Sequence, residues 1–286
     1  MLHSVFYTCL RYNVPYARRA TTQNRDKTSR FFLIARAKWN TFCPAALFPY
    51  GRTSLMQGAL LVDKPKTWTS FDVVNYVRRM VAAAEGKKPK NTKVGHIGTL
   101  DPLATGLLVL LIGKEYTRKA TELTKLDKTY EVTLKLGETS TTGDDEGAKT
   151  AVSDTIPTSD AILAALATFR GDIMQTPPAF SAIKVDGKRA YDLAREGKEV
   201  KLQPRPVTIY ALTLTNFEYP FVEFTAEVSS GTYIRSLAED VGNQLGTGAY
   251  MSDLRRTRIS DFVIENAVKI DGLNVEIVQE HLVELP

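Results

Sequence analysis

Residues 95–106 read Gly95-His96-Ile97-Gly98-Thr99-Leu100-Asp101-Pro102-Leu103-Ala104-Thr105-Gly106. Three glycines, a histidine and an Asp-Pro step in so short a stretch are typical of a tightly turned loop rather than of a packed element. Pro102 fixes its own φ angle and biases Asp101 toward an extended backbone, so the carboxylate is held in one direction. A phosphate-binding loop is excluded, because neither Gly-Lys-Ser/Thr nor Gly-x-Gly-x-x-Gly occurs here. By spacing alone, Asp101 is predicted to be an Asp-Pro turn residue.

The segments around this loop predict both strands and helices. The apolar runs 58–62 and 107–112 predict buried strands, and residues 128–136 alternate between apolar and polar side chains as a half-buried strand of an antiparallel sheet does. Further strands are expected at 206–214 and 221–229. Helices are expected at 159–169, from Ile234 onward, and after Thr69 or Ser70, either of which can cap a helix with the apolar positions Phe71, Val74, Val77 and Val81. The pattern predicts an α+β fold with a mixed, mostly antiparallel sheet flanked by helices.

The first 56 residues differ in composition from the rest. They carry nine Lys/Arg and one acid, Asp26, with both cysteines, Cys9 and Cys43. This composition is typical of a mitochondrial transit peptide. The alternative is a disordered basic extension or an upstream extension of the reading frame, with Met56 as the working start. We favour this alternative and a cytoplasmic protein; a true transit peptide would make it mitochondrial.

Residues 57–286 are expected to form one domain with a net charge of −3, from 28 basic and 31 acidic side chains. This balance excludes a general polyanion binder, so any nucleic acid must bind through local basic patches. The domain has no cysteine, and His96 is its only histidine away from the chain end. We therefore expect no disulfide framework and no metal site. No apolar run is long enough to span a membrane.

The loop 95–106 resembles, almost residue for residue, the catalytic motif of the TruB family of tRNA pseudouridine synthases. The resemblance covers about residues 57–270. Other motifs of that family follow in the family's order: Asp63-Lys64-Pro65, Asp127-Lys128-Thr129-Tyr130, Gly171-Asp172-Ile173, Ser181-Ala182-Ile183-Lys184, Gly231-Thr232-Tyr233-Ile234-Arg235 and Leu254-Arg255-Arg256.

The resemblance implies a pseudouridine synthase fold and an isomerase that acts on tRNA as a monomer, without cofactor or metal. The reaction detaches the T-loop uridine (position 55) from its ribose, rotates the base and reattaches it through C5. Asp101 is implied as the nucleophile, with attack on either the base ring or the sugar carbon. Because the uridine lies in a folded RNA loop, it must be flipped out before it reacts.

The resemblance also assigns roles to residues around Asp101. Arg235 is expected to pair with Asp101 and hold it ionised. Tyr130 is expected to stack on the base and handle a proton, although its strand position equally fits a core aromatic. His96 is expected to fill the space that the flipped base leaves. Asp144 either interacts near the active site or belongs to a solvated acidic turn.

The remaining substrate contacts are expected to come from Lys64, Leu254 and three basic patches. A phosphate backbone needs cations, and all three patches lie near family motifs. The patches are Lys87, Lys88, Lys90 and Lys93; Lys184, Lys188 and Arg189; and Arg255, Arg256 and Arg258.

Two departures from the family pattern stand out. Phe180 replaces the usual tyrosine before Ser181, so stacking survives there while a hydroxyl is lost. The chain also ends about 20 residues after its last recognisable strand, so we expect no C-terminal RNA-binding (PUA) domain and a weaker, more salt-sensitive grip on tRNA.

Three other functions compete with this one. A guide-RNA-dependent pseudouridine synthase would need that C-terminal domain and protein partners. A non-catalytic tRNA-folding chaperone would be expected to lack Asp101, Tyr130 or Arg235, and all three are present. A glycosidase would need a second paired carboxylate, and the sequence shows none.

Overall fold

A computed structural model describes residues 55–181, 183–185, 187–198 and 200–285. The predictions for the basic segment 1–56 therefore lie outside the described residues, apart from Leu55 and Met56. None of the described helices is both long and apolar enough to cross a membrane.

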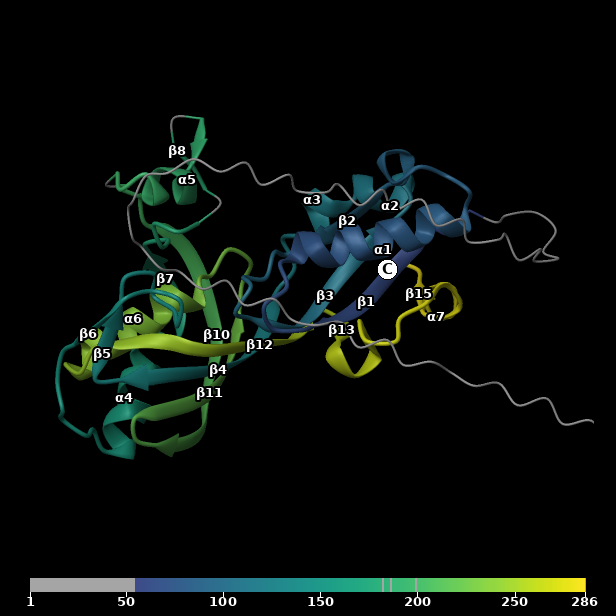
Figure 1. Cartoon of the computed structure of the whole chain (residues 1–286). Helices are drawn as coiled ribbons and strands as arrows, with labels where there is room; N and C mark the ends of the chain where they lie inside the picture. Colours follow the sequence, from purple (N-terminus) through teal and green to yellow (C-terminus); the bar gives the residue numbers. More distant parts are fainter. Residues whose placement is uncertain (1–54, 182, 186, 199, 286) are drawn as a thin grey trace, which may run out of the picture. The chain divides into compact units, whose positions relative to one another are not determined.

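The main sheet has eleven strands, eight of them in the order β14-β1-β3-β12-β4-β11-β10-β7 (Figure 1). β2 pairs with β3, β13 with β12 and β15 with β1; β5–β6 and β8–β9 form separate two-stranded sheets. Only β1–β14 and β3–β12 are parallel among the described pairings, which confirms the mixed, mostly antiparallel sheet. The strands are β1 (Gly58–Lys64), β2 (Val94–Ile97), β3 (Thr105–Ile112), β4 (Lys128–Leu136), β5 (Glu138–Ser140), β6 (Lys149–Ala151), β7 (Gly171–Gln175), β8 (Lys184–Val185), β9 (Lys188–Arg189), β10 (Arg205–Glu218), β11 (Phe221–Val228), β12 (Ala249–Ile259), β13 (Phe262–Val263), β14 (Val268–Lys269) and β15 (Leu282–Val283).

The helices flank this sheet, α1 beside β2 and α6 beside β12 (Figure 1). Thr69 caps α1 through a reciprocal capping box with Asp72, as one of the two expected caps. The expectation that Phe71 belongs to the apolar face of α1 is wrong, because Phe71 is exposed and Val73 is buried in its place. The helices are α1 (Ser70–Ala84), α2 (Lys114–Arg118), α3 (Ala120–Leu123), α4 (Ser159–Thr168), α5 (Ala190–Arg195), α6 (Ile234–Leu245) and α7 (Val275–Glu280), with 3-10 turns η1 (Pro89–Asn91) and η2 (Ile264–Asn266).

The apolar core divides at the junction of β3 and β12. The described residues form three apolar clusters. One packs α1 against β1 and β3, one packs α2 and α3 against the other face of β1 and β3, and one packs α4 and α6 against β4, β10 and β11. The two halves meet where Thr105 pairs with Arg255 and Gly106 with Arg256. A Cβ on Gly106 would lie 2.3 Å from the Arg256 carbonyl oxygen, so only glycine allows this approach. The loop that contains Asp101 enters the sheet at this junction.

Candidate active site

The Asp101 loop connects β2 to β3 and is hydrogen-bonded along its length. The buried Ser70 hydroxyl accepts from the Leu100 N–H at 2.8 Å and donates to the Leu100 carbonyl at 3.0 Å. The Thr67 N–H donates to the Pro102 carbonyl at 2.8 Å. These contacts fix the residues on both sides of Asp101, whose side chain remains 42% exposed. A fixed backbone that presents an accessible carboxylate suits a nucleophile.

The ion pair expected between Arg235 and Asp101 is present. Arg235 is the second residue of α6, and its Nη2 lies 2.9 Å from Asp101 Oδ2. The guanidinium is almost fully buried and also donates to two carbonyl oxygens, those of Phe180 at 3.0 Å and Thr142 at 3.3 Å. Three fixed partners leave little rotational freedom to the side chain, so Arg235 orients Asp101.

Asp144 lies on the other side of the same guanidinium. Its Oδ2 is 3.6 Å from Arg235 Nη1, and its side chain is buried. Its other oxygen accepts from the Thr142 hydroxyl and from the Glu146 N–H. The alternative of a solvated turn is therefore wrong for Asp144, although its neighbour Asp145 is exposed. One arginine thus bridges two carboxylates.

Tyr233 and Gln175 were not identified from the sequence. Tyr233 lies at the start of α6, and burial raises the pKa of its phenol above the ordinary value, with Arg235 and Asp101 among its charged neighbours. The buried amide of Gln175 clamps the Tyr233 backbone: the Tyr233 N–H donates to Oε1 at 2.8 Å, and Nε2 donates to the Tyr233 carbonyl at 3.1 Å. Tyr233 lies inside a quoted family motif, whereas nothing in the spacing singles out Gln175.

Tyr130 lies on β4 opposite Arg256 of β12, and it is buried. It packs in the same apolar cluster as Leu100, Leu103 and Leu254. Tyr130 is therefore a core aromatic, as its strand position predicts. It also lies near the site, because the same core cluster includes the base of the Asp101 loop. Leu254 is buried there too, and it and Tyr130 are each 7% exposed, so each presents only a small part of its side chain to a substrate.

His96 lies on β2, half-buried below the loop. Burial lowers the pKa of its imidazole below the ordinary value, and the nearby Arg256 cation lowers it further, so the ring is neutral at pH 7. Its Nδ1 has no hydrogen-bond partner among the described residues. A buried ring nitrogen without a partner carries an unmet hydrogen bond.

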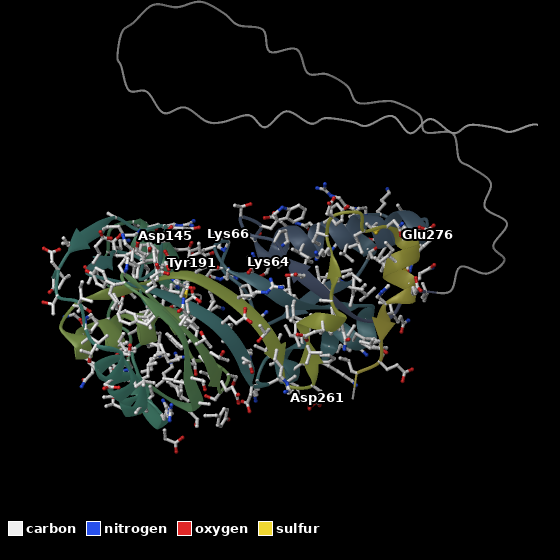
Figure 2. The ribbon with its side chains drawn as sticks, turned by 90° about the horizontal axis from the view of Figure 1, so that it is seen from below. Lys64, Lys66, Asp145, Tyr191, Asp261 and Glu276 are labelled. Carbon is white, nitrogen blue, oxygen red and sulfur yellow. The ribbon has the colours of Figure 1, made fainter. Side chains whose placement is uncertain are left out.

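The prediction that Lys64 contacts the substrate is not supported, because its side chain is 0% exposed. Its Nζ donates to the carbonyl oxygens of Trp68 at 2.7 Å, Pro65 at 3.0 Å and Pro102 at 3.5 Å. Burial lowers its pKa to about 8, opposed by the charge of Asp101. Figure 2 shows Lys64 near Lys66, whose Nζ lies 3.0 Å from Asp253 Oδ1 on β12. Lys64 supports the Asp101 loop from inside.

The basic patch at 255–258 is also corrected. Arg256 is 1% exposed, so it cannot contact an RNA phosphate from this position. Arg255 makes a bidentate ion pair with Asp63, at 2.9 and 3.1 Å, so its charge is already matched. Of the three arginines only Arg258 is exposed. Alternation along β12 turns Arg255 and Arg256 to opposite faces of the sheet. A register shift in the β12–β4 pairing between Arg256 and Arg258 breaks this alternation, so Arg258 does not follow Arg256 into the interior.

The other two basic patches lie on the surface. Lys87, Lys88, Lys90 and Lys93 are all exposed around η1. Lys184, Lys188 and Arg189 lie on β8 and β9 and line an open cavity of about 690 Å³ together with Arg195 of α5. Tyr191, labelled in Figure 2, lies between two arginines, with its ring centroid 5.8 Å from Arg189 and 5.5 Å from Arg195. Asp192 and Glu196 also line this cavity, so its four cations exceed its acids by two. An excess of positive charge beside an aromatic ring suits nucleic acid.

A metal has no obvious site in the part of the chain that the structure describes, since no three His, Cys, Asp or Glu side chains cluster there.

The chain is similar to known proteins along most of its length. The family model for the "TruB family pseudouridylate synthase (N terminal domain)" matches residues 86–234, and that for the "tRNA pseudouridylate synthase B C-terminal domain" matches residues 235–284. The tRNA pseudouridine synthase B of Aquifex aeolicus is 46% identical over 218 residues, 76% of this chain and 73% of the relative. That of Burkholderia mallei is 45% identical over 77% of this chain and 70% of the relative.

Solved structures show the same fold at lower identity. A Cbf5-Nop10-Gar1 complex aligns at 28% identity with a TM-score of 0.59, over 79% of this chain and 60% of the matched chain. An H/ACA RNP bound to a substrate RNA containing 2'-deoxyuridine aligns at 26% identity with a TM-score of 0.55, over 79% of this chain and 58% of the matched chain. The chain thus spans about 60% of the length of these structures.

Proposed function

Because the chain belongs to the TruB family of pseudouridylate synthases, we propose that it isomerises one uridine in the T-loop of tRNA, at position 55, to pseudouridine. The observation that carries this proposal is the ion pair between Arg235 and the accessible carboxylate of Asp101, 2.9 Å apart at the junction of the two halves of the sheet. The two relatives at 45–46% identity, both named tRNA pseudouridine synthase B, support tRNA as the substrate.

Asp101, Arg235 and Asp144 have different roles in the reaction. Asp101 attacks the flipped uridine with the oxygen that Arg235 leaves unpaired, Oδ1, while Arg235 and Asp144 keep the carboxylate oriented. The N1–C1' bond breaks, the base rotates, and a C5–C1' bond replaces it. The bond between Asp101 and the nucleotide breaks again before the product leaves, so the carboxylate is regenerated. The hydrogen on C5 must leave and N1 must gain one, so the product has the composition of the substrate. Attack at the sugar carbon or at the base ring uses this same carboxylate.

Other residues hold the nucleotide during this exchange. Tyr130 stacks on the base from β4, and the neutral His96 fills the vacated space with its unpartnered Nδ1 available for a hydrogen bond. The surface cations Lys184, Lys188 and Arg189 contact the RNA backbone. No cofactor is required in this scheme, because bonding changes balance within the uridine. The enzyme acts as a monomer in the cytoplasm.

The test is to incubate the purified full chain with an unmodified tRNA transcript, without guide RNA or partner proteins, and to map pseudouridine along the product. We expect one pseudouridine, at position 55, and none in a transcript with cytidine there. Product only after addition of guide RNA and partners would support the guide-dependent alternative instead. Accelerated tRNA refolding without any pseudouridine would support the chaperone alternative. Either result would contradict the proposal.

A further inference from the structure

Arg256 is a fully buried charged side chain near the site, and the reaction scheme above does not use it. It lies on β12 with 1% of its surface exposed, and it forms no ion pair with any described residue. A buried charge is costly unless fixed hydrogen-bond acceptors surround it. The groups that accept hydrogen bonds from Arg256 therefore indicate the role of this buried charge.

Those acceptors lie at the two ends of the catalytic loop. Arg256 Nη2 donates to the Gly98 carbonyl at 2.7 Å, and Nε donates to the Leu107 carbonyl at 2.8 Å. The side chain of Tyr130, the cross-strand neighbour of Arg256, lies beside the guanidinium and interacts with its charge. One planar guanidinium thus reaches the residues that precede and follow Asp101 and also the aromatic side chain proposed to stack on the base.

Two glycines of the loop allow its backbone to approach Arg256 closely. Gly98 has a φ of +67°, and a Cβ there would lie 3.0 Å from Arg256 Nη1. Gly106 brings β3 against the Arg256 backbone, where a Cβ would be 2.3 Å from its carbonyl oxygen. Both positions need glycine, so the loop closes tightly on the arginine.

We propose that Arg256 is a positioning residue, which sets the distance between the Asp101 carboxylate and the Tyr130 ring by holding both ends of the loop and the tyrosine together. This inference rests on the proposed function. The fork of a guanidinium donates in several fixed directions, whereas a lysine ammonium is a point donor, so Arg256→Lys replaces the charge but not the geometry. Small displacements of reacting groups reduce rates strongly even when substrate still binds.

The experiment compares wild type, Arg256→Lys and Arg256→Met in the full chain. The pseudouridine-forming rate is measured in a single turnover with saturating enzyme, and the tRNA dissociation constant is measured separately. Amide hydrogen exchange of the free protein reports on residues 98–107. Leu212→Ala is the matched control, because Leu212 is fully buried in β10 and its loss destabilises the fold without touching the loop.

We expect Arg256→Met to lower the saturated rate by about 100-fold, with the dissociation constant unchanged and faster exchange confined to the loop. Arg256→Lys is expected to recover only part of the rate. A wild-type rate in Arg256→Met, or a loss no greater than that of Leu212→Ala at equal melting temperature, would overturn the proposal. Inactive wild-type protein would contradict the proposed function instead, while slow exchange of the loop in Arg256→Met would still refute the anchoring.

Discussion

At the scale of single residues, Arg235 is the link between two carboxylates that the sequence separates widely. Its Nη1 lies 3.6 Å from Asp144 and its Nη2 lies 2.9 Å from Asp101. Asp144 therefore acts on the nucleophile only through the arginine. It is a positioning residue, and its contribution is measurable by removing its charge while keeping its shape.

Asp144→Asn is expected to lower the single-turnover rate at saturating enzyme by about 10-fold, equivalent to about 1.4 kcal/mol, because the guanidinium loses one of its two charged anchors. The tRNA affinity is expected to stay unchanged. The matched control is Asp145→Asn, one residue further along, where the side chain is exposed and pairs with Lys149 at 3.5 Å. Equal rates for the two variants would contradict this role.

Lys128 makes the stability of the protein depend on pH. It is buried beside the loop, and burial lowers its pKa to about 8 from 10.5, with Arg256 adding to the effect and Asp127 opposing it. Between these pH values the folded protein has released a proton that the unfolded chain still binds. The free energy of unfolding therefore rises with pH across that window, by about 1.4 kcal/mol per pH unit at most.

Lys128→Met removes this titration. The stability advantage of wild type over the variant is therefore expected to grow by roughly 2 to 3 kcal/mol between pH 8 and 10.5. Urea unfolding at several pH values measures it. Lys125→Met, at an exposed lysine three residues earlier, is expected to leave the pH dependence of wild type intact. Parallel stability curves for Lys128→Met and wild type would show that the buried lysine keeps its proton throughout.

At the scale of secondary-structure elements, the start of α6 is attached to the end of β7. Gln175 makes two hydrogen bonds to the Tyr233 backbone, and the Ser236 hydroxyl donates to the Thr176 carbonyl at 2.8 Å. Tyr233 and Arg235 both project from this helix start. The placement of α6 therefore decides where two site residues lie.

Gln175→Leu removes both hydrogen bonds and leaves the Tyr233 N–H unpaired, while the Tyr233 carbonyl still accepts from the Leu237 N–H at 3.1 Å. We expect a loss of roughly 2 kcal/mol in unfolding free energy and a rate reduced by at least ~10-fold. Gln175→Glu keeps an acceptor for the Tyr233 N–H. Its unfolding free energy and its rate are therefore expected to lie between those of wild type and Gln175→Leu. Met174→Gln, at the exposed neighbouring position, serves as the control for stability and rate. Full activity in Gln175→Leu would mean that α6 is held by its apolar packing alone.

The elements themselves were largely predictable from sequence, whereas the partners of charged residues were not. The alternation at 128–136 predicts β4 and its buried face, and the structure confirms both. Lys64 and Arg256 look like surface cations in the sequence, because nothing local shows what could satisfy a buried charge. Lys64 donates to the nearby Pro65 and Trp68 carbonyls and also to Pro102, 38 residues away. The acceptors of Arg256, in the Asp101 loop and on β3, are about 150 residues away. Only the sheet order, which pairs β3 with β12, brings them together.

At the scale of the whole molecule, the basic character is local. The net charge of residues 57–286 is −3, yet four cations surround the cavity beside Tyr191. RNA binding through phosphates depends on salt in proportion to the number of contacts, so this surface has a measurable signature.

Removing two of these cations tests that surface. Lys188→Gln with Arg189→Gln is expected to weaken tRNA binding and to reduce the slope of log affinity against log salt by about 1.5, with the saturated single-turnover rate unchanged. Lys114→Gln with Arg118→Gln removes equal charge from the exposed face of α2, outside the three basic patches, and is expected to change the slope little. Identical slopes for both double variants would assign the binding to total charge instead.

The central claim is that the Asp101 carboxylate forms the bond to the uridine nucleotide. Asp101→Asn keeps the shape of the side chain and removes its charge, so it is tested in a single turnover with unmodified tRNA at saturating enzyme. We expect a loss of at least ~10³-fold in the rate of pseudouridine formation, about 4 kcal/mol, with tRNA binding retained. Pseudouridine formed by Asp101→Asn at the wild-type rate would contradict it.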